Sequence, residues 1–122
     1  MPRFHLTSAV LGTPDPRGLV RFYQQILGWP IRDDEEHWVT LRPADGSTGL
    51  SFQREPDHVP PVWPPEPGTQ QMQLHLDIEV DDLEAAVAVA TGAGATVAGF
   101  QPQDGVRVCL DPAGHPFCLW VR

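Results

Sequence analysis

The sequence predicts an α+β fold made of two copies of one unit: a strand, a helix and three further strands. The first observation is a pair of helical segments with clear start and stop residues, each preceded by a short apolar segment. The second is that the two copies align when Asp15 is placed on Asp82, and three strand-like segments follow each helix. The third is a proline-rich segment, residues 55–71, which separates the copies and favours neither a helix nor a central strand.

The first copy occupies about residues 3–54. Residues 4–11 are short, apolar and rich in β-branched side chains, which predicts a strand. A helix is predicted over residues 15–27, because Asp15 suits the N-cap and Gly28 suits the stop. Turn-forming residues then separate three further predicted strands, at residues 29–34, 37–43 and 50–55.

The second copy occupies about residues 72–122. Residues 72–80 alternate between apolar and polar side chains, which predicts a strand whose apolar face, including Leu74, packs under a helix. That helix is predicted to begin after the N-cap Asp82 and to end in glycines. Three further strands are predicted at residues 95–100, 106–111 and 116–122.

The last two of these strands are predicted to form a hairpin. The sequence Asp111-Pro-Ala-Gly suits a type I turn followed by a glycine in the left-handed region. We therefore expect Asp111 to pair with His115 around a three-residue loop. The resulting register places Cys109 and Cys118 on opposite faces of the sheet, so both thiols are expected to be free.

Length and composition exclude several classes of protein. The 122 residues fit a single domain with its own hydrophobic core. The formal net charge of −8 argues against binding to nucleic acid or to an anionic membrane surface, since both need clusters of basic residues. No apolar run approaches the roughly 20 residues that span a bilayer, and the first residues lack the pattern of a secretory signal. A cytoplasmic location is expected.

Three stretches resemble a known family: FYQQILGW (22–29), HLDIEVDDLEAAV (75–87) and DPAGHPFCLW (111–120). They are similar to signatures of the vicinal oxygen chelate superfamily, and the chain looks closest to its glyoxalase-like domain branch. The superfamily includes glyoxalase I, extradiol dioxygenases, fosfomycin-resistance enzymes and bleomycin-resistance proteins. The resemblance implies two βαβββ modules whose strands form a curved, cup-like sheet with the helices outside, assembled as a homodimer.

The resemblance also implies where a metal is held in the metal-using members, at four positions on the cup face. Those positions correspond here to Ser8, Gln53, His75 and Cys118. Neutral serine and glutamine oxygens bring no charge to offset a dication, so we expect no cofactor beyond a divalent metal held incompletely at His75. The Glu, His and Glu positions of glyoxalase I are not reproduced beyond His75, which argues against that activity.

Several further residues are predicted to line the cup. Strand alternation puts Asp77 on the face of His75, and Trp120 on the face of Cys118. Trp38 comes from a neighbouring strand, and Trp63 in the proline-rich segment is expected to fold over the cup as a lid. The predicted ligand-binding residues are Ser8, Trp38, Gln53, Trp63, His75, Asp77, Cys118 and Trp120. The alternatives are that the indoles pack a dimer interface and that the polar side chains are only solvated.

Two functional hypotheses follow. The first is a protein of the bleomycin-resistance type, which binds a small, partly aromatic or cationic molecule without a complete metal site. The second is a metal-dependent lyase, isomerase or dioxygenase that uses His75 and a non-standard ligand set. A third possibility, a vestigial cup that acts through protein contacts, stays open, and so does the question of whether the protein is an enzyme.

Overall fold

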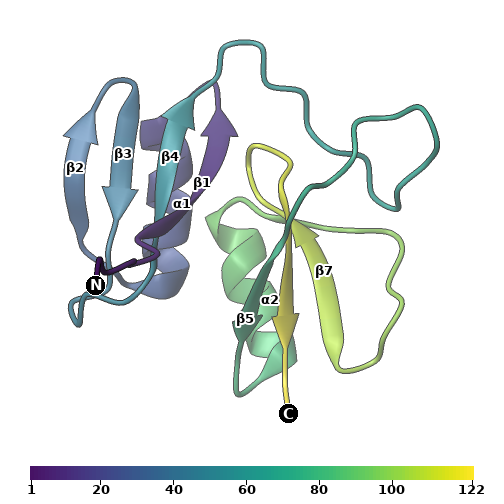
Figure 1. Ribbon diagram of the computed structural model, residues 1–122. Helices are drawn as coiled ribbons and strands as arrows, with labels where there is room; N and C mark the ends of the chain where they lie inside the picture. The colour runs from purple at the N-terminus through teal and green to yellow at the C-terminus, as the bar shows by residue number, and fades with distance from the viewer. The chain divides into compact units, whose positions relative to one another are not determined.

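A computed structural model describes residues 1–122 (Figure 1). The chain separates into two compact units, residues 1–58 (unit 1) and residues 59–122 (unit 2). Each unit contains one four-stranded sheet and one α-helix, which confirms the predicted α+β fold class. Neither helix has the length and hydrophobicity that crossing a membrane requires.

Unit 1 follows the predicted order of a strand, a helix and three strands. Strand β1 begins four residues later than predicted and pairs in parallel with β4, while β4, β3 and β2 pair antiparallel in that order. Helix α1 packs against β1, β3 and β4. The elements are β1 (Ser8–Thr13), α1 (Pro16–Leu27), β2 (Ile31–Glu35), β3 (Trp38–Leu41) and β4 (Gly49–Arg54).

Helix α1 begins and ends where its sequence predicts. The Asp15 carboxylate accepts a hydrogen bond from the amide of Gly18 at 3.0 Å, and Gly28 ends the helix with a φ of 72°. The apolar face of α1 covers a core in which Tyr23 and Phe52 have no exposed surface. Their rings stack with centroids 5.7 Å apart. This packing turns the opposite face of the sheet, which carries Ser8 and Gln53, away from α1.

Unit 2 repeats the arrangement of unit 1. Strand β5 pairs in parallel with β8, and β8, β7 and β6 pair antiparallel. Helix α2 is capped by Asp82 as predicted and packs against β6, β7 and β8. The elements are β5 (Leu76–Glu79), α2 (Leu83–Ala93), β6 (Thr96–Val97), β7 (Val106–Leu110) and β8 (Pro116–Trp120).

Strand β5 is shorter than the alternating pattern predicts. It begins at Leu76, and the Leu74 side chain is 51% exposed, so the prediction that Leu74 packs under the helix is wrong. Leu76 pairs with Phe117 of β8, and the residue before Phe117 is Pro116. Because proline has no backbone N–H, the ladder cannot continue past this pair. Residues 72–75 have the alternating pattern of a strand, but β8 offers no backbone that can pair with them.

The predicted hairpin between β7 and β8 is confirmed. The amide of Asp111 donates to the carbonyl of His115 at 2.9 Å, and the amide of Gly114 donates to the carbonyl of Asp111 at 2.8 Å. Gly114 has a φ of 87°, in the region that favours glycine. The resulting register pairs Cys109 with Phe117 on the buried face, and places Cys118 on the other face. Both cysteines are free, as predicted.

Candidate functional site

The candidate site is a pocket of about 260 Å³ on the sheet face of unit 2 that carries Cys118. Strand β5 contributes Asp77, β7 contributes Val106, and β8 contributes Cys118 and Trp120. His75 comes from the residue just before β5, and Gln103 comes from the loop between β6 and β7. Four of the predicted site residues therefore meet in one pocket: His75, Asp77, Cys118 and Trp120.

The polar end of this pocket is a cluster of three side chains. Nε2 of His75 lies 3.0 Å from a carboxylate oxygen of Asp77. Asp77 pairs with Cys118 in the parallel ladder of β5 and β8, which places their side chains next to each other. One nitrogen, one oxygen and one sulfur atom from the three residues all lie within 4.8 Å of one another. Asp77 thus joins the histidine to the thiol.

Burial and Asp77 together keep the Cys118 thiol protonated. Burial raises the pKa of Cys118, and the negative charge of Asp77 and a hydrogen bond to its carboxylate raise that pKa further. Cys109, which has no exposed surface, has its pKa raised to about 11, mainly by burial. A reactive cysteine needs the opposite environment, one that lowers the thiol pKa. Neither cysteine is therefore an activated nucleophile.

The other end of the pocket is the indole of Trp120. The guanidinium carbon of Arg122 lies 5.5 Å from the centre of this ring, an arrangement typical of a cation–π contact. Nε of Arg122 also pairs with a carboxylate oxygen of Glu79 at 2.9 Å. Asp77 and Glu79 lie two residues apart in β5 and therefore share one face of the sheet. Glu79, however, pairs with Arg122 and does not line the pocket. The indole therefore contacts a cation, and its cross-strand neighbour in β7 is the apolar Val106.

Three predicted site residues, Ser8, Trp38 and Gln53, belong to unit 1. They lie on the sheet face opposite α1, where Trp38 and Gln53 pair across β3 and β4. Nε2 of Gln53 donates to a carboxylate oxygen of Glu55 at 2.7 Å. The hydroxyl oxygens of Ser8 and Ser51 lie 2.7 Å apart, within hydrogen-bond distance. Ser8 is thus paired with the neutral Ser51, and the neutral Gln53 is paired with Glu55. None of the three predicted residues offers a charged metal ligand.

The strand register identifies Ser51 as a residue that sequence reasoning missed. In unit 2, Asp77 lies five residues before the N-cap Asp82 and pairs with Cys118. In unit 1, Val10 lies five residues before the N-cap Asp15 and pairs with Ser51. The position of β4 that corresponds to Cys118 is therefore Ser51, two residues before Gln53. The pairing of β1 with β4 identifies this position, and no pattern within either segment reports that pairing.

The remaining predicted residue, Trp63, packs within unit 2 against Phe100. Its indole N–H donates to the carbonyl of Phe100 at 3.2 Å, and the two ring centroids lie 6.1 Å apart. Trp63 is not among the residues that line the 260 Å³ pocket. Two pocket residues were not predicted. Val106 pairs with Trp120, so the predicted hairpin register already contained its signal, whereas the loop residue Gln103 carried none.

Comparison with known proteins places the chain in a family. The model of the glyoxalase-like domain family matches residues 8–120, which include every strand and both helices. No curated protein matches the chain. Solved structures do match over nearly their whole lengths, at identities that show a shared fold and nothing more specific.

Three of these structures illustrate the kinds of protein that share this fold. A glyoxalase/bleomycin resistance protein/dioxygenase family enzyme from Burkholderia phytofirmans is 19% identical, with a TM-score of 0.75 and coverage of 97% of this chain and 98% of that one. A glyoxalase/dioxygenase from Nostoc punctiforme is 22% identical, with a TM-score of 0.66 and coverage of 95% and 89%. TnmS3, an antibiotic binding protein from a Streptomyces species, is 21% identical, with a TM-score of 0.64 and coverage of 99% and 98%. The chain therefore belongs to the glyoxalase-like domain family of the vicinal oxygen chelate superfamily.

Proposed function

We propose that the protein binds a small organic cation with an aromatic or apolar body in the unit 2 pocket. The observation that carries this proposal is the pairing of a carboxylate, Asp77, with an indole, Trp120, in one pocket. An apolar wall with a few polar groups that fix orientation is the usual design of a small-molecule site. In this reading Trp120 and Val106 contact the body of the ligand, and Asp77 accepts hydrogen bonds from its charged end.

The size of the pocket limits the ligand. Its volume of about 260 Å³ lies just below the range of typical ligand pockets, which is roughly 300–1,000 Å³. That space suits one ring with a short amine arm, or one end of a larger molecule. The ligand class is therefore a small aryl or alkyl amine, or a larger compound that carries such a group.

The charge of the site favours a cation. The whole chain has a formal charge of −8, and no basic side chain lines this pocket apart from His75, which is paired with Asp77. The Trp120 ring already contacts one guanidinium group, which supports a role of this ring in contacts with cations. An ammonium group between Asp77 and Trp120 would receive both kinds of contact.

Two further observations support binding without covalent chemistry. The raised pKa of Cys118 keeps its thiol protonated and poorly nucleophilic. TnmS3, which shares the fold, binds an antibiotic, so this architecture is compatible with a binding role. At 21% identity that likeness supports only the type of function and not the ligand.

The proposal is tested by calorimetric titration of a matched pair of ligands, an aryl amine and the neutral alcohol of the same shape. The amine should bind the wild-type protein more tightly. Asp77→Asn should weaken amine binding by about tenfold while leaving the alcohol unaffected, because a charge-assisted hydrogen bond contributes about 1.5–3 kcal/mol and solvent screens part of it here. Trp120→Ala should weaken both ligands.

The matched control is Glu84→Gln, which removes the same charge from the exposed surface of α2. It should leave both affinities unchanged. Equal loss of amine binding in Glu84→Gln and Asp77→Asn would mean that overall charge and not the pocket attracts the amine. If no amine of a panel of aryl and alkyl amines binds the wild-type protein, the proposal is refuted.

A second candidate function is metal-dependent catalysis at the cluster of His75, Asp77 and Cys118. The donor set fits a borderline-soft ion such as Zn²⁺, since imidazole nitrogen, thiolate sulfur and carboxylate oxygen are its usual ligands. Such an ion would act as a Lewis acid on neighbouring substrate oxygens. His75 and Cys118 would have to give up their contacts with Asp77, and Cys118 its proton, before they could hold it.

This competition predicts a pH-dependent affinity. Because the raised pKa of Cys118 opposes formation of the thiolate, Zn²⁺ binding should strengthen steadily as the pH rises from weakly acidic to alkaline. Metal content measured by mass spectrometry on untagged protein should fall to background in His75→Ala. Cys118→Ser should flatten the pH profile. A His75→Ala variant that keeps its metal would eliminate this candidate.

A further inference from the structure

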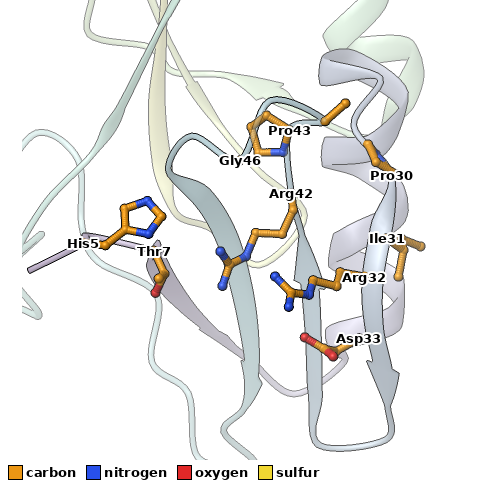
Figure 2. Close-up of a pocket in the computed structure, with 10 residues that line it drawn as sticks. His5, Thr7, Pro30, Ile31, Arg32, Asp33, Arg42, Pro43 and Gly46 are labelled. Atoms are coloured by element: carbon orange, nitrogen blue, oxygen red, sulfur yellow. The ribbon is translucent and has the colours of Figure 1, made fainter. Parts of the chain in front are cut away.

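Unit 1 contains a second and larger pocket, with a volume of about 760 Å³. It lies where β2 begins and β3 ends, beside the chain segment that precedes β1 (Figure 2). It shares no residue with the unit 2 pocket. Its charged and titratable lining residues are Arg32, Arg42, His5 and Asp33, so two arginines are gathered in one place in a chain that has only 8 basic residues against 16 acidic ones.

A β-bulge brings the two arginines together. Ile31 pairs with Leu41 and Asp33 pairs with Thr40, so Arg32 is an extra residue with no partner in β3. A bulge redirects a side chain that regular alternation would send to the other face. Arg42 follows Leu41, which is fully buried in the core, and so projects to the opposite face. Figure 2 shows the guanidinium groups of Arg32 and Arg42 side by side and pointing the same way.

The arginines lack protein partners for their charge. Neither takes part in any of the three ion pairs of the chain. Nε of Arg42 is buried and has no hydrogen-bond partner, and it is the only buried side-chain nitrogen or oxygen in the chain without one. A buried donor without an acceptor is unfavourable, and a charged one more so. An acceptor from outside the chain would satisfy it.

Neither of the nearby carboxylates forms an ion pair with Arg32 or Arg42. Asp33 accepts a hydrogen bond from the hydroxyl of Thr40 at 2.7 Å, and its amide donates to the same hydroxyl oxygen at 3.0 Å. Asp34 pairs with Arg17 at 2.8 Å. Asp33 keeps its negative charge, so the two arginines and this one carboxylate leave the pocket with a net positive charge when His5 is counted as neutral.

We propose that this pocket binds a small anionic group, a carboxylate or a phosphate. The planar guanidinium groups present parallel N–H donors that match the oxygens of such a group. His5 and Thr7 lie across from the arginines in Figure 2 and add two further groups that can donate. This site is independent of the proposed cation pocket, because every one of its residues lies in unit 1.

The test is a calorimetric titration of the full chain with inorganic phosphate and, separately, with succinate, with sodium chloride added to keep the ionic strength constant. At least one of the two anions should bind with a saturable isotherm, and the tighter one identifies the group that the pocket prefers. Arg42→Gln and Arg32→Gln should each weaken that anion by about tenfold or more, because each removes charge-assisted hydrogen bonds.

The matched control is Arg21→Gln, which removes the same charge from an exposed position of α1 in the same unit. Its affinity should equal that of the wild type. Circular dichroism shows whether each variant is folded. Because Arg32→Gln alters an exposed side chain, this variant tests the pocket even if Arg42→Gln does not fold. Equal weakening in Arg21→Gln and the pocket variants would overturn the proposal. Absence of saturable binding of both anions to the wild type would overturn it as well.

Discussion

Replacing Phe117 by alanine is expected to lower the free energy of unfolding by about 3–5 kcal/mol. The Phe117 side chain has no exposed surface, and in the sheet it lies between its partners Leu76 and Cys109. The substitution removes the burial of an entire ring and leaves a cavity that neighbouring strands fill only in part. Because Phe117 directly precedes Cys118 in β8, this loss also loosens the strand that forms one side of the unit 2 pocket.

The measurement is urea unfolding followed by circular dichroism, with Phe100→Ala as the matched control. Phe100 is 50% exposed and its ring contacts the Trp63 ring, so its loss should change the free energy of unfolding by about 1 kcal/mol. Equal effects of the two substitutions would show that Phe117 is not part of the core.

Replacing Gly114 by alanine is expected to lower the free energy of unfolding by about 2–4 kcal/mol, for two separate reasons. With a φ of 87°, Gly114 has a backbone conformation that residues with a Cβ atom rarely adopt. A Cβ at this position would also lie 2.6 Å from Cβ of Pro60 in the proline-rich segment. Something must move, so the substitution strains the hairpin that positions Cys118 and Trp120.

The control is Gly92→Ala. Gly92 lies near the end of α2, has an ordinary φ, and nothing lies within 4 Å of where its Cβ would be. Alanine there should raise the free energy of unfolding by about 0.5 kcal/mol, since it is the better helix former. The double variant Gly114→Ala with Pro60→Gly should recover the steric part of the loss and leave the conformational part. A stability of Gly114→Ala equal to that of the wild type would contradict the assigned turn.

The local signals of the sequence were enough to predict both helices and the closing hairpin. Asp15 and Asp82 cap their helices with their own side chains, so their roles depend only on residues a few positions away. The turn after Asp111 is likewise determined by its own residues. Once that turn is known, the register of β7 and β8 follows, and with it the opposite faces of the two cysteines.

Other features that depend on how one segment pairs with another were not predicted. The start of β5 is set by Pro116, which lies 40 residues further along the chain than Leu76. The bulge at Arg32 depends on how β2 pairs with β3, and the hydrogen bond between Ser8 and Ser51 depends on how β1 pairs with β4. No pattern within any one of these segments reports such pairings.

The residues of the candidate site that strand alternation could predict are those in β5 and β8, together with His75 directly before β5. Alternation along β5 and β8 correctly grouped Asp77, Cys118 and Trp120 with His75, although His75 lies just outside the strand. Gln103 comes from a loop, where alternation has no meaning, and so it was not found. The larger pocket of unit 1 was not predicted either, because Arg32 and Arg42 lie within predicted strands and no local pattern sets them apart from other strand residues. The homodimer implied by the family resemblance stays a prediction.

The most direct test of the proposed function is a two-dimensional amide NMR titration of the wild-type protein and of Asp77→Asn with the aryl amine. In the wild type the largest shifts should fall on residues of the unit 2 pocket, led by Asp77, Val106, Cys118 and Trp120. These shifts should need much more amine to saturate in Asp77→Asn. Shifts spread over the acidic surface, or a binding site elsewhere in the chain, would refute binding in the unit 2 pocket.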